Sequence, residues 1–325
     1  METVYKDIHN IILGSKRIAI ISHKFPDWDA LWSSCALYQV IKTNFKNKKV
    51  DIINVDWVAE KLSFLPNSGN IIKKFDQDKY DICIFVDVWN INLAWFWEKV
   101  NYRMPIVNID HHASNIWYWD INLVENTKSS SATVLFDYFK WMWYSFDKEI
   151  ATCLLTWIYT DTGSFMYSNV RPTTFYRASY LLDIWWDIDL IAKNFFLNNT
   201  FSFVKLLWKV LWRLKISNDG IGYSYLKKEE ICQSWCKYEE MDWIVWRLNM
   251  LDNVKYVCFL YEKWDIVKWS LRTTREDVDL TEIVKKFNWW WHRKATWFSL
   301  DWYISTDDKW KIDINLVDGN IIKIW

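Results

Sequence analysis

The sequence predicts an α/β protein in which a doubly wound, mainly parallel sheet is joined by a helical connector to a smaller α/β domain. Short apolar runs alternate with helical patterns through the first half of the chain, helical patterns then continue to about Lys215, and strand-like runs return beyond that point. Strands that alternate with helices favour a parallel sheet covered by its crossover helices. The predicted boundaries are residues 1–199 for the first domain, 200–217 for the connector and 218–325 for the second domain.

The elements of the first domain are expected in a regular order. A short buried strand over 17–21 precedes a polar loop and a helix over about 29–44, whose apolar residues recur with the 3.6-residue period of a helix. Further strands are expected near 50–55, 82–88 and 106–109. In an open sheet of this kind, ligands bind beyond the carboxyl ends of the strands.

The second half of the chain is expected to begin with helices and to end with strands. Helical patterns start at Ser130 and include an amphipathic segment over 203–214, and Asn218-Asp219-Gly220 is a turn that opens the second domain. The strands expected there cover 221–225, 254–261 and 312–317, and Asp318-Gly319 predicts a closing hairpin with 320–324.

Composition limits the possible function. The chain has 40 basic and 40 acidic residues, so no global field draws it to nucleic acid or to a membrane, although a local pocket remains open to a short nucleic acid. No apolar run approaches the ~18 residues of a membrane span, and the N-terminus lacks the pattern of a signal peptide. The six cysteines lack the spacing of a complete zinc site, so free thiols are expected. We therefore expect a cytoplasmic protein.

The chain contains 27 tryptophans but only 6 glycines, the reverse of the usual proportion. Trp185-Trp186 follows a helical run where a left-handed cap favours glycine, and Trp264 and Trp310 lie in polar turn contexts. We infer that most tryptophans stand at glycine positions, as when a UGA codon decoded as glycine is read as tryptophan. The alternative is a protein that is truly rich in tryptophan and uses it to stack bases or sugars.

Four polar clusters lie at the ends of predicted strands or of a helix, and three of them converge on one crevice. The clusters are His23 with Asp27-Trp28-Asp29, Asp87, Asp110-His111-His112, and Asp161-Thr162-Gly163. Carboxylates mixed with imidazoles suit a pair of divalent metal ions, with Mn²⁺ favoured and Mg²⁺ or Co²⁺ as alternatives.

Each of these residues alone has a structural explanation. Asp27 and Asp29 could serve as turn and N-cap residues, and His112 could be a buried, hydrogen-bonded histidine. Five carboxylates and three histidines at such positions nevertheless favour a metal site. A glycine at position 28 would strengthen this interpretation, because a turn between two aspartates that bind metal leaves little room for an indole.

With these motifs, the chain resembles the DHH phosphoesterases. Its second half resembles the DHH-associated domain that follows in many of them. The resemblance covers nearly the whole chain, and the tryptophans in its motifs fall on the glycines of the family. The matching motifs are His23/Asp27/Trp28/Asp29, Asp87, Asp110-His111-His112, Asp161-Thr162-Gly163, Ser270-Leu271-Arg272 and Trp289-Trp290-Trp291-His292.

The resemblance implies a two-metal centre in which Asp87 bridges the ions. His23 and Asp27 would complete one ion's ligands, and Asp29, His111 and Asp161 would complete those of the other. Asp110 would orient a neighbouring histidine, and His112 would contact the scissile phosphate or the leaving group. The residues implied to bind the substrate are Ser270, Arg272, Trp289, Trp290, Trp291 and His292, the tryptophans standing for a glycine loop. The two serines Ser130-Ser131 are expected to cap a helix.

Within the family, the chain is most similar, in its length and its pair of domains, to one branch of enzymes. That branch hydrolyses short oligoribonucleotides to 5′-mononucleotides and converts 3′-phosphoadenosine 5′-phosphate to AMP. A phosphodiesterase for cyclic di-AMP or a linear dinucleotide is the alternative. If the tryptophans are literal, the protein would instead be an inactive nucleotide-binding module. The expected partners are short RNA or small nucleotides, without long duplexes or membranes, and a homodimer is the default assembly.

Overall fold

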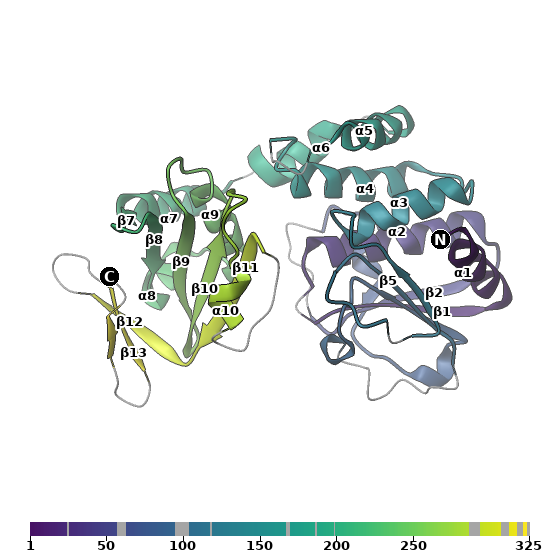
Figure 1. Cartoon of the computed structure of the whole chain (residues 1–325), viewed down its shortest axis with the longest axis horizontal. Coiled ribbons are helices and arrows are strands. Elements are labelled where there is room, and N and C mark those ends of the chain that lie inside the picture. Colours follow the sequence, from purple (N-terminus) through teal and green to yellow (C-terminus); the bar gives the residue numbers. More distant parts are fainter. Residues whose placement is uncertain are drawn as a thin grey trace. The chain divides into compact units, whose positions relative to one another are not determined.

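A computed structural model gives the fold of the chain (Figure 1). It describes residues 1–325 except 25, 57–62, 95–103, 118, 167–169, 186, 198, 286–292, 307–311, 317–320 and 324–325. The chain divides into two compact units, Met1–Leu197 and Asn198–Trp325. All six cysteines are free, as expected. Within the described residues, no helix combines the length and the apolar character needed to cross a bilayer.

The first unit contains a six-stranded parallel sheet in the order β3-β2-β1-β4-β5-β6. The chain proceeds outward from β1 in one direction and from β4 in the other, so the predicted doubly wound fold is confirmed. The strands expected in this half correspond to β1, β2, β4 and β5, whereas β3 and β6 were not predicted. The strands are β1 (Arg17–Ser22), β2 (Lys49–Ile53), β3 (Ile71–Ile72), β4 (Ile82–Val86), β5 (Ile106–Asp110) and β6 (Ile121–Val124).

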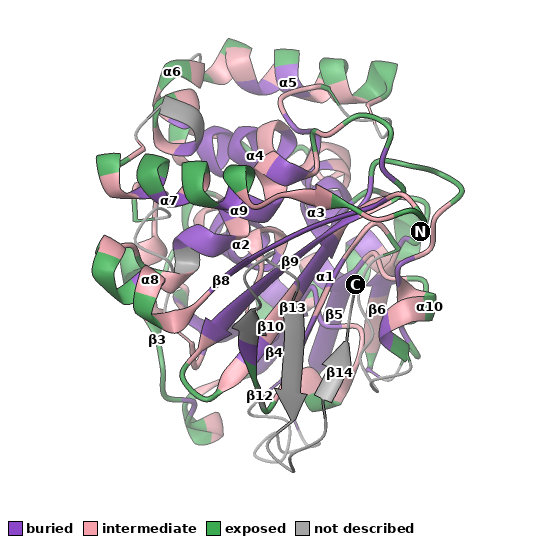
Figure 2. Cartoon of the chain, turned by 90° about the vertical axis from the view of Figure 1, so that its left-hand side faces the viewer, coloured by how far each residue is buried: buried purple, intermediate pink, exposed green. Residues whose placement is uncertain are grey.

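Helices cover this sheet, and its strands are largely buried (Figure 2). Helix α2 follows β1 and packs against β1 and β2, α4 packs on α2, and α5 packs on α4. Helix α1, which the sequence analysis did not anticipate, contacts β6. The helices of this unit are α1 (Glu2–Gly14), α2 (Trp28–Asn44), α3 (Ser131–Trp141), α4 (Lys148–Asp161), α5 (Pro172–Ile184) and α6 (Ile188–Ala192).

The second unit has a five-stranded mixed sheet in the order β11-β10-β9-β8-β7 and a three-stranded antiparallel sheet, β12-β13-β14. Only β8 and β9 pair in parallel within the larger sheet. The predicted closing hairpin corresponds to the antiparallel pairing of β13 with β14, while its expected turn, Asp318-Gly319, lies outside the described residues. The strands are β7 (Lys215–Ile216), β8 (Ile221–Leu226), β9 (Tyr256–Lys263), β10 (Ile266–Arg272), β11 (Ala295–Leu300), β12 (Trp302–Thr306), β13 (Ile312–Leu316) and β14 (Ile321–Lys323). The helices are α7 (Phe201–Trp212), α8 (Lys228–Ser234), α9 (Met241–Leu248) and α10 (Thr281–Val284).

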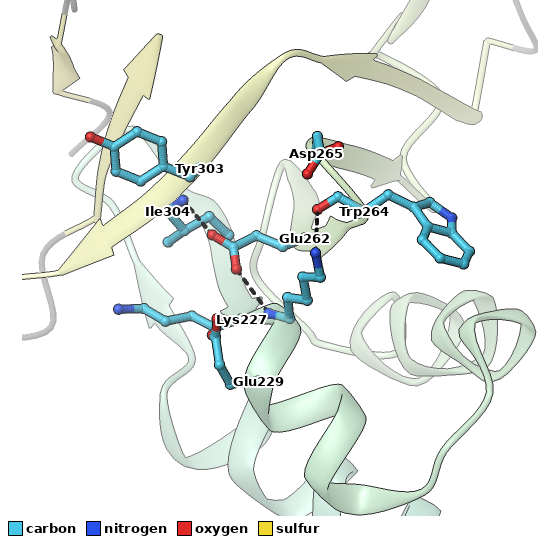
Figure 3. Close-up of a pocket in the computed structure, with 8 residues that line it drawn as sticks. Lys227, Glu229, Glu262, Trp264, Asp265, Tyr303 and Ile304 are labelled. Carbon is cyan, nitrogen blue, oxygen red and sulfur yellow. Dashed lines mark hydrogen bonds between the residues drawn. The ribbon is translucent and has the colours of Figure 1, made fainter. Parts of the chain in front are cut away.

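The buried carboxylate of Glu262 on β9 connects three elements of this unit (Figure 3). Its Oε2 accepts a hydrogen bond from the backbone N–H of Lys228 at the start of α8, at 2.8 Å, and its Oε1 accepts one from the N–H of Ile304 on β12, at 2.6 Å. Two backbone donors satisfy a carboxylate that burial would otherwise destabilise. Because both oxygens are engaged, we assign Glu262 a structural role and do not place a ligand in the pocket beside it.

Four tryptophans of the described chain adopt left-handed backbone conformations, in which a side chain is normally disfavoured. These are Trp117, Trp143, Trp235 and Trp264, with φ between 54° and 62°. Trp235 caps α8 and Trp264 begins the tight turn between β9 and β10, which are positions where glycine is preferred. The prediction of a turn conformation at position 264 is therefore confirmed.

Trp143 follows α3 in a complete Schellman motif, the helix ending that most favours glycine. Its own N–H donates to the carbonyl of Lys140, and the N–H of Tyr144 donates to the carbonyl of Phe139. The indole is 90% exposed, so little packing compensates for the strained backbone.

Two expectations about individual tryptophans are wrong. Trp185 ends α5 with an extended backbone, φ −151°, instead of a left-handed cap, so nothing in its conformation requires glycine. Trp28 is the first residue of α2, where its ring packs against Trp32 and Phe195, so the expected turn at this position is absent. The predictions for Trp186 and Trp310 lie outside the described residues.

We expect Trp143→Gly and Trp235→Gly each to raise the free energy of unfolding by about 1 kcal/mol, because glycine removes the left-handed penalty. Urea denaturation would measure this change. Trp208→Gly is the matched control, because Trp208 is also exposed but lies within α7. There glycine should lower the unfolding free energy by roughly 0.5–1 kcal/mol. Destabilisation by all three substitutions would contradict the prediction.

Candidate metal centre

The polar clusters predicted from the sequence meet at the carboxyl edge of the first sheet. His23 follows β1, Asp87 follows β4, and Asp110 ends β5. β1 and β4 are neighbours at the point where the strand order reverses, which is where open α/β sheets form their ligand crevice.

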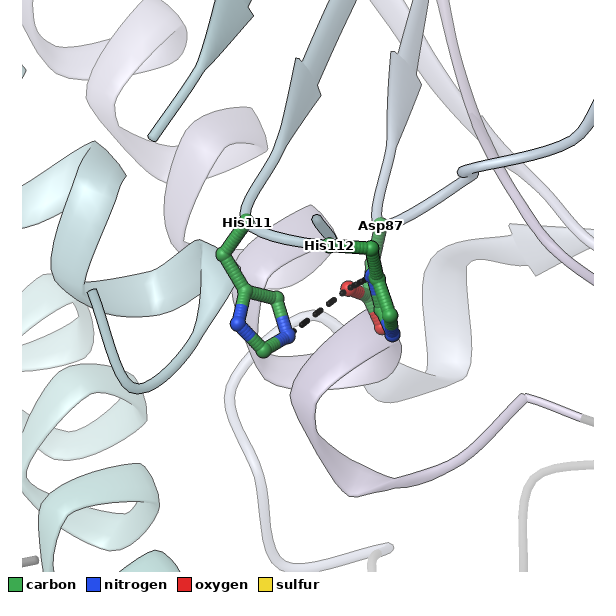
Figure 4. A group of neighbouring side chains, drawn as sticks. All are labelled: Asp87, His111 and His112. Carbon is green, nitrogen blue, oxygen red and sulfur yellow. Dashed lines mark ion pairs between the residues drawn. The ribbon is translucent and has the colours of Figure 1, made fainter. Parts of the chain in front are cut away.

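Two groups of potential ligands share Asp87. His23, Asp27 and Asp87 form one group, and Asp87, His111 and His112 form the other, with the ligand atoms of each group within 4.8 Å of one another. Figure 4 shows His111 and His112 beside the Asp87 carboxylate. The two oxygens of Asp87 face different groups: Oδ2 lies 3.6 Å from His23 Nε2, whereas Oδ1 lies 3.8 Å from His111 Nε2.

Backbone carbonyls fix the orientation of two of the histidines. His23 Nδ1 lies 2.8 Å from the carbonyl oxygen of Lys24, and His111 Nδ1 lies 3.3 Å from that of Lys128. A carbonyl accepts only, so each Nδ1 is the donor and each Nε2 is directed toward the carboxylates. Histidines that bind metal are typically held in this way through their other nitrogen.

Asp27 and Asp29 lie on either side of Trp28 and have different surroundings. Asp27, with 41% of its side chain exposed, caps α2 by accepting a hydrogen bond from the N–H of Ala30 and lies 3.8 Å from His23 Nε2. The carboxylate of Asp29 accepts hydrogen bonds from the N–H groups of Ser131 and Ala132, at 2.7 and 3.1 Å. The capping role that the sequence allowed for Asp27 therefore coexists with its place in the polar cluster.

Asp110 is completely buried and is held from two sides. Its Oδ1 lies 2.7 Å from His112 Nδ1, and its Oδ2 accepts a hydrogen bond of 2.6 Å from Asn115. The neighbouring histidine that Asp110 orients is thus His112. The Trp89 ring packs against the other side of His112, with 4.3 Å between ring centroids.

Protonation in this cluster depends on the close approach of opposite charges. Burial alone would lower the pKa of His23, but the nearby carboxylates of Asp27 and Asp87 raise it to about 10. Burial alone would likewise raise the pKa of Asp87, but its contact with His23 and the nearby charges of His112 and His111 hold it well below the usual range. Without metal, a protonated His23 therefore balances the central carboxylate.

The remaining carboxylates are crowded. Burial and the charge of Asp27 raise the pKa of Asp161, at the end of α4, to about 7. Burial together with the charges of Asp87 and Asp27 raises the pKa of Asp29, although the N–H of Ser131 opposes this shift. Several negative charges thus compete for one small volume, which is typical of sites that bind cations.

The structure brings the predicted metal ligands together within the first unit, and Asp161 interacts electrostatically with both Asp27 and Asp29. In the second unit, Ser270 is buried on β10, and Arg272 donates to the backbone carbonyls of Leu271 and Thr296. Trp289, Trp290, Trp291 and His292 lie outside the described residues.

Sequence reasoning missed the partners of the site: Asn115, Trp89, the carbonyl of Lys128 and the hydroxyl of Ser131. Of these, only Asn115 has a sequence signal, since it follows Asp110-His111-His112 closely in the same loop. The others became recognisable only once the fold placed them beside the cluster.

Comparison with known proteins agrees with the fold. Residues 17–158 match the DHH family, N-terminal domain. A probable bifunctional oligoribonuclease and PAP phosphatase NrnA of Streptococcus mutans is 25% identical over 284 residues, covering 87% of this chain and 89% of that protein. An exopolyphosphatase-related protein from Bacteroides fragilis superposes with a TM-score of 0.83, at 24% identity and 91% coverage of each chain. RecJ from Thermus thermophilus, solved in complex with Mn²⁺, gives a TM-score of 0.53 at 12% identity, covering 92% of this chain and 52% of that one.

The match to the DHH domain and the similarity to these relatives identify a metal-dependent hydrolase with a parallel-sheet α/β fold. Residues 17–158 form a DHH domain, so the chain carries the N-terminal domain of the DHH phosphoesterase family.

We expect Asp161→Asn to stabilise the metal-free protein at alkaline pH. A carboxyl whose pKa is raised by folding contributes stability below its unfolded pKa and loses that contribution as the pH rises through the folded value, here about 7. The difference between variant and wild type should therefore grow from a few tenths of a kcal/mol at pH 4 to roughly 4 kcal/mol at pH 8.

Urea denaturation in EDTA at several pH values would test this expectation. Asp183→Asn, at an exposed position on α5, is the matched control and should shift stability equally at every pH. A pH-independent difference for Asp161→Asn would contradict the proposed crowding.

Proposed function

We propose that this protein is a cytoplasmic two-metal phosphoesterase that hydrolyses short oligoribonucleotides to 5′-mononucleotides and converts 3′-phosphoadenosine 5′-phosphate to AMP. The observation that carries the proposal is the orientation of the Asp87 carboxylate, whose Oδ2 faces His23 while its Oδ1 faces His111. The similarity to the Streptococcus mutans relative along most of both chains supports the choice of substrate.

The donor set fits two divalent ions. His23, Asp27 and Asp87 would hold one ion, and Asp87, Asp29, His111 and Asp161 would hold the other. The carbonyl contacts at Nδ1 of His23 and His111 leave each Nε2 available as a neutral ligand, as metal binding requires. Mixed imidazole and carboxylate ligands favour Mn²⁺, with Mg²⁺ or Co²⁺ as alternatives. Binding to His23 would release its proton, so metal affinity should rise with pH.

Bound ions would supply a water of lowered pKa and would neutralise charge at the phosphorus under attack. His112 would act from the protein side, since its Nδ1 is held by Asp110 and its pKa is raised by that contact despite burial. A protonated imidazole in this position would donate a hydrogen bond to the scissile phosphate or to the leaving oxygen. Asp110, itself held by Asn115, would keep the ring oriented.

We assign the grip on a second phosphate of the substrate to Ser270, Arg272 and His292. The Arg272 guanidinium matches phosphate geometry, and its contacts with the carbonyls of Leu271 and Thr296 orient it on β10. Ser270 lies on the same face of this strand, two residues away. A glycine loop at positions 289–291 would allow backbone N–H groups to approach that phosphate closely.

The proposal includes glycine at most of the tryptophan positions of the chain. The left-handed conformations of Trp143, Trp235 and Trp264 support it, because each stands where a cap or turn favours glycine. Reading the codons of the gene tests it: UGA at 143, 235, 264 and 289–291 would establish recoding, whereas UGG would establish literal tryptophan.

We expect the protein carrying glycine at positions 28 and 289–291 to release 5′-mononucleotides from a labelled RNA trinucleotide when Mn²⁺ is present. EDTA should abolish turnover, because the nucleophile depends on the ions. Asp87→Ala should reduce the rate by about 10³-fold or more, the scale of losing a central catalytic group. Asp183→Asn is the control and should retain full activity.

Thin-layer chromatography of the products would separate the outcomes, with the printed sequence assayed in parallel. Hydrolysis of cyclic di-AMP but not of the trinucleotide would replace the proposed substrate with the cyclic dinucleotide. Binding of nucleotides without hydrolysis of either would favour the inactive binding module.

A further inference from the structure

Helix α3 directs its first residues at the candidate metal centre. Ser131 is completely buried, and its hydroxyl donates a hydrogen bond of 2.8 Å to Asp87 Oδ1. Its backbone N–H donates to Asp29 Oδ2 at 2.7 Å. A single residue outside the acidic and histidine motifs therefore contacts two of the predicted ligands.

The hydroxyl contacts only one of the two Asp87 oxygens. Oδ1 lies on the side of His111 and His112, at 3.8 and 3.6 Å, whereas Oδ2 lies on the side of His23. The terminal torsion of an aspartate is soft, so the backbone does not determine which oxygen faces which group. A hydrogen bond to Oδ1 resists rotation of the carboxylate and occupies one of its acceptor positions.

Capping of the helix does not account for this hydroxyl. Ser130 is the N-cap of α3, and its hydroxyl accepts a hydrogen bond from the N–H of Thr133 at 3.1 Å. The expected capping role therefore belongs to Ser130. The neighbouring hydroxyl of Ser131 instead points to the buried carboxylate.

We propose that Ser131 is a positioning residue that sets the orientation of Asp87, so that one oxygen serves each ion. This inference rests on the proposed two-metal centre. Ser131→Ala removes the hydroxyl and keeps the backbone N–H that Asp29 accepts. Partners that orient a ligand typically contribute about 10–100-fold to metal affinity. Ser131→Ala should therefore weaken Mn²⁺ binding by about that factor and raise the Mn²⁺ concentration for half-maximal activity in parallel.

Ser130→Ala is the matched control, because it removes a buried hydroxyl one residue away that caps the helix and does not contact the ligands. It should lower the midpoint of urea denaturation and leave Mn²⁺ affinity unchanged. Isothermal titration calorimetry with Mn²⁺ on the full chain would measure affinity directly, and denaturation in EDTA would show that Ser131→Ala is folded.

The outcomes are distinguishable. If wild type binds Mn²⁺ and Ser131→Ala binds it equally well, the positioning role is overturned while the metal centre stands. Equal weakening by both alanine variants would also overturn it, because the effect would then come from the helix. If wild type itself binds no Mn²⁺, the proposed metal centre fails, and the inference that rests on it fails with it.

Discussion

The structure of the site depends on one buried carboxylate, that of Asp87, which is only 1% exposed and follows β4 with a left-handed backbone, φ 61°. Such a conformation costs about 1–3 kcal/mol, and a buried charge without partners would cost more. The neighbours offset both costs: the backbone N–H of Asp87 donates to the carbonyl of Ile109, and imidazoles surround the carboxylate. The ends of β1 and β5, the two strands beside β4, therefore supply the partners that Asp87 requires.

The same arrangement crowds several carboxylates together, and this crowding is unfavourable when no metal is bound. Burial raises the pKa values of Asp29 and Asp161, the charge of Asp27 raises both further, and a protonated His23 supplies part of the missing positive charge. Divalent cations would replace that proton and relieve the repulsion among the carboxylates. The parallel sheet and the start of α3 hold these groups in position before any ion binds. Repulsion among the carboxylates would therefore lower the stability of the metal-free protein, a trade-off that is common at active sites.

The parallel sheet and the clustered ligands could be predicted because they follow from periodicity and from the geometry of strand ends. Apolar runs defined β1, β4 and β5, and polar residues directly after them had to share one edge. The hydroxyl of Ser131 was beyond prediction, because a serine before a helix has the same sequence signal whether it caps the helix or contacts a distant carboxylate. The left-handed conformation expected at Trp185 was wrong for a related reason. A helix can also end in an extended conformation, and no particular residue type in the sequence indicates that ending. By contrast, the left-handed Trp264 was predictable, because polar residues on both sides indicated a turn.

Anomalous diffraction from crystals of the full chain soaked in Mn²⁺ would show whether Asp87 bridges two divalent ions. Two anomalous peaks are expected beside Asp87, one next to His23 and Asp27 and the other next to His111 and Asp29. A single peak, or peaks that do not contact Asp87, would show that Asp87 does not bridge two ions.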